Sequence, residues 1–367
     1  MVQTPTPTRH LREWLRGCLR LSRPPSRTAS TEDLDEQIRR ASYALQWLER
    51  RRPGWLDRRN SASESAGPAE SWTLPRSLGQ FLILRELGRG GFGVVLLVRE
   101  GDGPPMALKL PRPELLVEDE LLNQFLLEAR VVSMLDHPNL VRVLEAGAIG
   151  PLYYICYAYY PGPTLADRVG RAGPRVAPAE AAAIVAAVGA GLQHAHDRGV
   201  LHRDVAPHNI ILVPADAAEA GGGLGVAVGT GIVPKLADFG LSRIMGEHQA
   251  DDPLPLAGRL PYLAPEELDT RFGAVGPAAD VYALGAVLYE LLVGSPPFPA
   301  SPRGQSLRRI LAEPPPAPRR LRPDIPEPVE SACLRCLAKR PEDRFPSVGS
   351  FVAALGQLGG ATTERDG

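Results

Sequence analysis

The sequence contains few cysteines, almost no net charge and no long apolar run. It has 367 residues and only four cysteines, which fits a reducing compartment and excludes a fold built on a disulfide framework. The net charge of −1 favours neither nucleic-acid nor membrane binding. No apolar stretch reaches about 18 residues, so we expect no transmembrane segment. The first residues lack the charged start and apolar stretch of a secretory signal, and we expect a cytoplasmic protein.

The length and the apolar content set the scale of the fold. A chain of this length divides into about two to three domains, or forms one two-lobed domain with an extension. The apolar fraction of 44% is sufficient for a sizeable core, and the 37 glycines and 38 prolines predict many or long loops.

A Cys-x-x-Cys pair at Cys333 and Cys336 is typical of redox and zinc sites. The pair lies in a stretch with helical apolar periodicity, which predicts that both thiols face a helix core. Nothing in the sequence pairs the remaining cysteines, Cys18 and Cys156, to complete a metal site. We therefore expect structural cysteines.

Residues 1–76 differ in composition from the rest. Amphipathic helices are expected near Arg9–Leu21 and Glu32–Arg52, and residues 1–60 hold 13 arginines and 7 acidic residues, a net charge of +6. Two interpretations stay open. The segment could dock on a partner helix or an acidic surface, or it could be a marginal extension, because a seam of about two heptads is short for a stable coiled coil. Residues 60–77, rich in Ser, Ala, Gly and Pro, predict a linker.

A glycine pattern follows the first strong strand signal, at Phe81. Gly88, Gly90 and Gly93 have Gly-x-Gly-x-x-Gly spacing, which also occurs in dinucleotide-binding folds. Such folds need a helix directly after the glycines, whereas β-branched residues here predict a second strand. We therefore expect a hairpin whose backbone lies over phosphates, with Val95 covering a base.

A lysine occurs in the next apolar strand, where a charge is costly unless it is paired. Lys109 is expected to pair with Glu128, in a helical run. The alternative is that Lys109 extends to solvent from an edge strand.

The stretch from Val200 to Asn209 reads V-L-H-R-D-V-A-P-H-N, the layout of a phosphoryl-transfer site. Asp204 is placed to accept a hydroxyl proton, and Asn209 is placed to hold magnesium. The flanking apolar residues, Val200–Leu201 and Ile210–Leu212, predict short buried strands. Alone, the stretch could be a chance loop with an N-cap aspartate, but later motifs argue against that.

Those later motifs follow in order. Asp238-Phe239-Gly240 puts a carboxylate at a strand end, where it suits magnesium. Residues 214–233 are expected to form a flexible insertion in a hairpin. The run from Asp280 to Leu292 is apolar nearly all round and predicts a central buried helix. Arg344 is expected to pair with Glu266.

The joint pattern of these motifs resembles a eukaryotic-type protein kinase over about Phe81 to Leu358. The residues within the motifs resemble those of bacterial Ser/Thr kinases of the planctomycete-like branch. The resemblance implies an α+β, bilobal kinase fold at residues 77–358. It comprises a β-rich N-lobe with one helix (81–157), a hinge (158–162) and a helical C-lobe (163–358). The helical extension and linker, residues 1–76, precede it.

The resemblance also implies ATP and Mg²⁺ as cofactors. It assigns catalysis to Asp204, Lys109, Glu128 and Asn209, and magnesium binding to Asn209 and Asp238. Adenine is expected at the hinge backbone, with the Tyr157 side chain gating the pocket behind. The implied nucleotide contacts are Leu87, Gly88, Arg89, Gly90, Gly91, Phe92, Gly93, Val94, Val95, Ala107, Lys109, Tyr157, Ala158 and Tyr160.

Two linked departures from the family pattern lie near Asp204. Ala206 stands where Ser/Thr kinases usually carry a lysine, and Arg259 stands where they carry the threonine that binds that lysine. Arg259 is a hypothetical source of the missing positive charge. Tyrosine kinases have alanine at this position too, with an arginine nearby that His208 does not replace, so a tyrosine acceptor stays open.

The segment between Gly240 and Ala264 offers few phosphorylation sites. Its hydroxyl residues are Ser242 and Tyr262, both near the ends. We predict that Asp251-Asp252 orders the segment against Arg203 without a phosphate. Two solvated loop acids are the alternative.

Three functions fit these observations. The leading prediction is an ATP- and Mg²⁺-dependent protein kinase that phosphorylates Ser or Thr of a protein substrate in signal transduction. The second is an ATP-binding, pseudokinase-like scaffold acting through residues 1–60, supported by Ala206 and Arg259. The third is a small-molecule phosphotransferase, against which Ala264-Pro265-Glu266 and Arg344 argue.

Overall fold

The computed structural model describes residues 76–90, 93–111, 129, 132–149, 152–172, 176–220, 231–239, 259–299 and 303–360. The predictions for residues 1–75, for Gly91, Phe92 and Glu128, and for the segment 240–258 lie outside these residues.

A six-stranded sheet forms the N-terminal part of the fold, with strand order β1-β2-β3-β4-β6-β5. All neighbouring strands run antiparallel, and each pair of consecutive strands from β1 to β4 is adjacent in the sheet. The strands are β1 (Ser77–Leu78), β2 (Phe81–Gly90), β3 (Gly93–Glu100), β4 (Met106–Pro111), β5 (Val143–Ile149) and β6 (Leu152–Ala158).

The glycine-rich stretch is a hairpin, as predicted. β2 pairs with β3 up to Gly90 opposite Gly93, so a strand, not a helix, follows the glycines. Gly93 has φ +140°, a backbone conformation that residues with a Cβ rarely adopt. The hairpin therefore rules out the dinucleotide-type loop.

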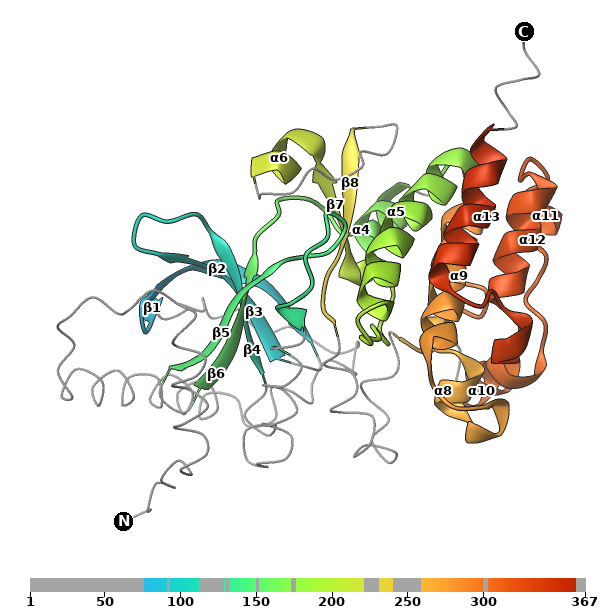
Figure 1. The fold of residues 1–367 in the computed structure, drawn as a ribbon, viewed down its shortest axis with the longest axis horizontal. Coiled ribbons are helices and arrows are strands. Elements are labelled where there is room, and N and C mark those ends of the chain that lie inside the picture. The colour runs from blue at the N-terminus through green and yellow to red at the C-terminus, as the bar shows by residue number, and fades with distance from the viewer. Residues whose placement is uncertain are drawn as a thin grey trace, which may run out of the picture.

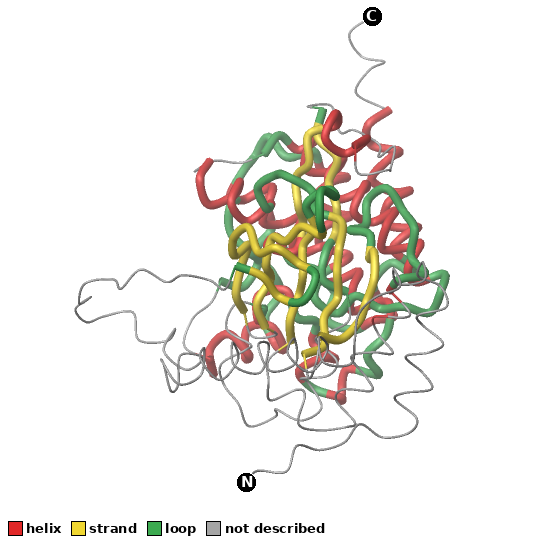
Figure 2. The backbone as a smooth tube through the Cα atoms, turned by 90° about the vertical axis from the view of Figure 1, so that its left-hand side faces the viewer, coloured by secondary structure: helices red, strands yellow, loops and turns green. Residues whose placement is uncertain are grey.

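Helices make up the C-terminal part, which lies beside the sheet in Figure 1. The tube in Figure 2 shows the strands in front of the helices in the rotated view. The helices are α4 (Leu165–Ala172), α5 (Pro178–His196), α6 (Ala215–Ala220), α8 (Pro265–Leu268), α9 (Pro277–Val293), α10 (Arg303–Ala312), α11 (Pro318–Leu321), α12 (Glu327–Cys336) and α13 (Val348–Gly360).

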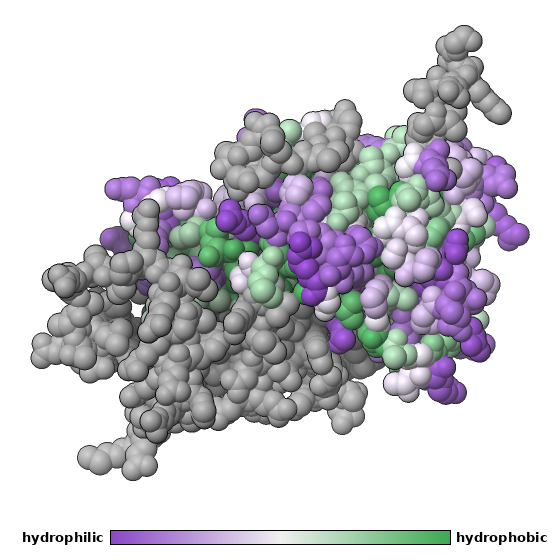
Figure 3. Space-filling model, viewed as in Figure 1, coloured by the Kyte–Doolittle hydropathy of each residue, from purple (hydrophilic) through white to green (hydrophobic). Residues whose placement is uncertain are grey.

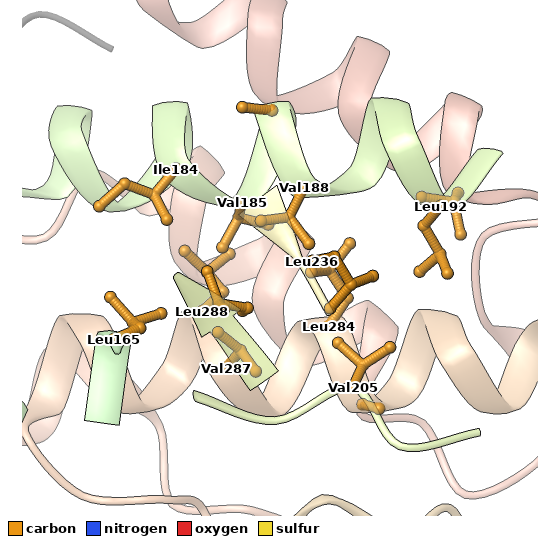
Figure 4. Close-up of a cluster of buried hydrophobic side chains, with 14 of the residues drawn as sticks. Leu165, Ile184, Val185, Val188, Leu192, Val205, Leu236, Leu284, Val287 and Leu288 are labelled. Carbon is orange, nitrogen blue, oxygen red and sulfur yellow. The ribbon is translucent and has the colours of Figure 1, made fainter. Parts of the chain in front are cut away.

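The main core lies between α5 and α9. Figure 4 shows apolar side chains of α5 facing those of α9, and Val205 and Leu236 from two other segments lie among them. The predicted central helix is confirmed, since nearly every residue of α9 is buried. Val205 follows Asp204 directly, so the core fixes the backbone next to the candidate catalytic carboxylate.

A two-stranded hairpin, β7 (Ile210–Pro214) and β8 (Ile232–Leu236), lies between the sheet and the large helices (Figure 1). Its far end carries α6, so the predicted loop insertion at 214–233 begins with a helix instead. The sequence A-D-A-A-E-A of α6 is rich in good helix formers, which explains the difference.

One strand prediction is wrong. Val200–Leu201 is not a strand, because the Val200 N–H donates to the Ala195 carbonyl at 3.0 Å in the turn that ends α5.

Two side-chain predictions are confirmed. Cys333 and Cys336 are fully buried in α12, and burial raises the pKa of both thiols. Arg344 forms a buried two-pronged ion pair with Glu266, with nitrogen–oxygen distances of 2.6 and 2.7 Å.

The described surface is mostly polar in the view of Figure 3, with apolar patches on the sheet and between the helices. Among the described helices, none has the length and apolar character needed to cross a bilayer.

Candidate active site

An ion pair joins the sheet to the hairpin of the helical part. The Lys109 ammonium, in β4, lies 2.6 Å from Asp238 Oδ1, just beyond β8. Lys109 is only 3% exposed, so this charge is paired as the cost of burial requires. Burial would raise the pKa of Asp238, but the Lys109 ammonium holds it below its usual value. The Glu128 partner expected from the sequence lies outside the described residues.

Asn209 connects the two acidic candidates. Its side-chain Nδ2 donates to the Asp204 backbone carbonyl at 2.8 Å and to Asp204 Oδ2 at 3.1 Å. Its backbone carbonyl accepts the Ala237 N–H at 2.8 Å, next to Asp238. Asn209 directly precedes β7 and Asp238 follows β8, so one end of the hairpin carries both candidate metal ligands.

The donor atoms at this end of the hairpin fit magnesium. Because the Asn209 amide nitrogen is engaged by Asp204, its amide oxygen is the atom left to act as a ligand. The Asp238 carboxylate supplies further oxygens. Carboxylate and amide oxygens are the hard donors that Mg²⁺ prefers.

His202 holds the loop of Asp204 against the segment of Asp238. Its buried ring accepts the Asp204 N–H at Nδ1, 3.2 Å away, and donates from Nε2 to the Ala237 carbonyl at 3.0 Å. This network assigns the neutral ring with its proton on Nε2, and burial lowers the pKa of His202 accordingly. The ring also packs edge-on against Phe239, with centroids 4.5 Å apart.

Two residues beside these groups have an unusual backbone. Arg203 has φ +59° and Asp238 has φ +65°, a region that residues with a Cβ occupy only when their surroundings enforce it. The buried Asp280 carboxylate enforces it at Arg203, by accepting the Arg203 N–H at 2.7 Å and the His202 N–H at 2.9 Å.

Asp280 lies in the buried helix predicted from the sequence, but the sequence alone indicates no contact for it. The Asp280 carboxylate also bonds His196 Nε2 at 2.7 Å. Burial would raise the pKa of Asp280, but the hydrogen bond with His196 holds it below its usual value. An aspartate within an otherwise apolar helix needs such partners, and this was the available signal.

Arg259 lies directly on Asp204. Its Nε donates to Asp204 Oδ1 at 2.6 Å, and its Nη2 donates to the Arg203 carbonyl at 2.7 Å. Ala206 is 1% exposed and carries no charge. A cavity with about 10 Å³ of room, roughly that of one water molecule, is lined by Asp204 and Arg259 together with Glu267 and Asp280.

The expected adenine contacts are neighbours in the sheet and hinge. Ala107 pairs with Tyr157 across β4 and β6, and Tyr157 is buried. The Ala158 N–H already donates to the Arg142 carbonyl at 2.9 Å, so this N–H is not available to a ligand.

The remaining predicted nucleotide contacts are the backbone of Tyr160 and the residues of the β2–β3 hairpin. The Tyr160 ring lies 4.3 Å from the Lys235 ammonium, so its expected contact to adenine comes from the backbone. The described hairpin members lie in β2 and β3, with Gly88 opposite Val95 and Arg89 opposite Val94; they are Leu87, Gly88, Arg89, Gly90, Gly93, Val94 and Val95.

Lys109, Lys235 and Lys339 are the only lysines of the whole sequence. The Lys235 ammonium donates to the Pro138 carbonyl at 2.6 Å, and the Lys339 ammonium donates to the Ile310 carbonyl at 2.6 Å. Burial lowers the pKa of each of these two ammonium groups to about 8. Sequence reasoning singled out neither.

Comparisons with known proteins agree with this geometry. A family model described as the protein kinase domain matches residues 81–352. The chain is 34% identical over 282 residues to the serine/threonine-protein kinase Pkn1 of Myxococcus xanthus, covering 76% of this chain and 38% of Pkn1. It is 33% identical over 282 residues to the serine/threonine-protein kinase PrkC of Bacillus subtilis, covering 76% and 40%. The chain therefore spans about two fifths of the length of these relatives.

A solved structure matches over nearly its full length. The kinase domain of Mycobacterium tuberculosis PknI has a TM-score of 0.58 and 29% sequence identity, covering 78% of this chain and 99% of that one. This likeness, together with the sheet and helices described above, confirms the expected fold.

Proposed function

Because the chain belongs to the protein kinase domain family, we propose that it transfers the γ-phosphoryl group of ATP to serine or threonine hydroxyls of a protein. The observation that carries this proposal is the convergence of Lys109, Asp204, Asn209 and Asp238. They come from β4, the loop before β7, the residue directly before β7 and the segment after β8, and hydrogen bonds link them.

Asp204 is suited to accept the proton of the attacking hydroxyl. The hydroxyl oxygen forms a bond to the γ-phosphorus, the bond from that phosphorus to the ADP oxygen breaks, and the proton passes to the carboxylate. Asp204 Oδ1 accepts from Arg259 and Oδ2 accepts from Asn209. Each carboxylate oxygen has two lone pairs, so both retain capacity for the incoming hydroxyl.

The other residues bind and orient the nucleotide. Lys109 carries the ammonium that contacts the α- and β-phosphates, and Asn209 and Asp238 hold magnesium. Magnesium held there would supply positive charge that neutralises the phosphates. The Ala158 carbonyl and the Tyr160 backbone bind adenine, and the β2–β3 hairpin covers the phosphates with backbone N–H groups.

The test is phosphoryl transfer from radiolabelled ATP to the protein itself and to a mixture of acceptor proteins. Asp204→Asn keeps the size of the side chain and is expected to slow transfer by about 100-fold or more, with nucleotide binding retained. Asp216→Asn, at an exposed aspartate of α6, is the matched control and should leave the rate unchanged.

Two results would contradict the proposal. ATP binding with no transfer dependent on Asp204 would indicate a nucleotide-binding scaffold. Phosphotyrosine as the main product in phosphoamino-acid analysis would overturn the assignment of the acceptor to serine or threonine.

A further inference from the structure

Next to Asp204, the structure supplies a cation from a segment 55 residues further along the chain. We propose that Arg259 is a positioning residue for phosphoryl transfer: it fixes the Asp204 carboxylate and provides the positive charge that Ala206 lacks. This inference rests on the proposed kinase function and assigns a role to a residue outside the motifs that define the site.

The contact geometry favours a positioning role. Two nitrogens of one guanidinium, Nε and Nη2, bind the Asp204 carboxylate and the Arg203 carbonyl, at 2.6 and 2.7 Å. A planar group bound at two points fixes both its own orientation and that of its partner. The side chains of Arg259 and Asp204 are only 15% and 10% exposed, so solvent screens the interaction weakly.

The positive charge of Arg259 is needed because phosphoryl transfer depends on charged groups held in fixed positions around the phosphates. The γ-phosphoryl group is anionic, and its approach to a bare carboxylate is unfavourable. A guanidinium on that carboxylate offsets the repulsion. Residue 206, two positions after Asp204, is an uncharged and buried alanine, so the charge at Asp204 comes from Arg259.

The segment that carries Arg259 is anchored. The Tyr262 N–H donates to the Arg259 carbonyl at 2.9 Å, and the Tyr262 hydroxyl donates to Glu290 of α9 at 2.6 Å. Leu260 and Leu263 are buried against Phe298. A side chain on such a support holds its position more narrowly than one on a loose loop.

The experiment compares Arg259→Thr, Arg259→Lys and the double variant Ala206→Lys/Arg259→Thr with the wild type. For each, kcat, the KM for ATP, nucleotide binding and the melting temperature are measured. Arg271→Thr is the matched control, since Arg271 is 84% exposed and pairs only locally with Asp269. That control is expected to behave like the wild type.

The proposal expects Arg259→Thr to lower kcat by about 100-fold, with the KM for ATP and the melting temperature little changed. Arg259→Lys, which keeps the charge but not the planar fork, should lose about tenfold. The double variant should recover at least about tenfold over Arg259→Thr, because it returns a cation to the same carboxylate.

Three results would overturn the proposal. The first is a kcat of Arg259→Thr within about threefold of the wild type. The second is a kcat of Arg259→Thr above that of the wild type, which would show that Arg259 inhibits Asp204. The third is a loss of kcat in Arg259→Thr that is equally large in Arg259→Lys and in the folded double variant. If the double variant does not fold, the kcat of Arg259→Lys alone decides the question.

Failure of this inference is distinguishable from failure of the proposed function. If the wild type transfers phosphate, Asp204→Asn does not and Arg259→Thr does, only the role of Arg259 is refuted. If the wild type binds ATP but shows no transfer that depends on Asp204, both are refuted.

Discussion

Two of the buried charged groups in this protein are each held by several hydrogen-bond partners. The Asp280 carboxylate accepts from two backbone N–H groups and bonds His196. The Arg344 guanidinium binds both oxygens of Glu266 and the carbonyls of Ala278, Ala338 and Lys339. Such saturation is needed because an unpaired buried charge costs several kcal/mol.

The pair of Arg344 and Glu266 gives a test at this scale. Arg344→Ala leaves a fully buried carboxylate without its cation, so we expect a loss of about 3–5 kcal/mol in the free energy of unfolding. Urea denaturation measures it. Arg340→Ala, which removes an exposed arginine paired with Glu342, is the control and should change little. Equal effects of the two substitutions would contradict the explanation.

At the scale of elements, α9 and α12 approach closely at one glycine. A Cβ added to Gly285 of α9 would lie 2.3 Å from the Cβ of Cys336, where α12 ends. The Cys333 thiol also lies 3.6 Å from the Gly285 carbonyl oxygen. Gly285 therefore sets the spacing between the central helix and its neighbour.

We expect that replacing Gly285 by alanine destabilises the protein, although alanine has the higher helix propensity. Alanine favours a helix over glycine by about 0.5–1 kcal/mol, yet Gly285→Ala should destabilise by about 1–3 kcal/mol through overpacking. Gly170→Ala in α4 is the matched control, because a Cβ there meets nothing within 4 Å, and it should stabilise. Melting temperatures of the two variants should move in opposite directions. A shift in the same direction would refute the close approach.

The same scale shows what the sequence could and could not predict. The β2–β3 hairpin and α9 were predictable because glycine positions in the hairpin and a continuous apolar run in the helix are local signals. Val200–Leu201 misled because two apolar residues do not distinguish a strand from the turn that ends a helix. The segment that contains α6 was expected to be a flexible loop because it is rich in glycine. Residues 215–220 nevertheless favour a helix.

The site was predictable in its motifs and less so in its contacts. The sequence order identified Lys109, Asp204, Asn209 and Asp238 as site residues, and their hydrogen bonds now link them. The Arg259 contact to Asp204 joins segments 55 residues apart, and no periodicity encodes such a pairing. The hint in the sequence was the pair of linked departures, Ala206 and Arg259.

At the scale of the whole molecule, lysine is nearly absent. Of the three lysines, Lys235 and Lys339 have their ammonium groups over the rings of Tyr160 and Phe298, at 4.3 and 4.4 Å. Lys109 alone belongs to the candidate nucleotide site. Chemistry directed at amines should therefore report on that site with little background.

An ATP analogue with an acyl group on its terminal phosphate provides the test. Bound near the phosphate site, it should acylate Lys109, because proximity to a bound reagent outweighs intrinsic reactivity. Mass spectrometry of the digested protein is expected to locate the label there, and excess ATP should suppress it. Lys109→Arg is the control. Labelling of Lys235 or Lys339 to the same extent, insensitive to ATP, would argue against a nucleotide site at Lys109.

The β7–β8 hairpin has a consequence for how this chain tolerates variation. Asn209 and Asp238 lie at one end of the ribbon, and the residues between Pro214 and Ile232 leave from the other. Cross-strand hydrogen bonds along the ribbon tie the two ligand-bearing ends to each other, whatever the length of the excursion at the tip. A change in chain length between Pro214 and Ile232 is therefore expected to leave the two candidate metal ligands in place.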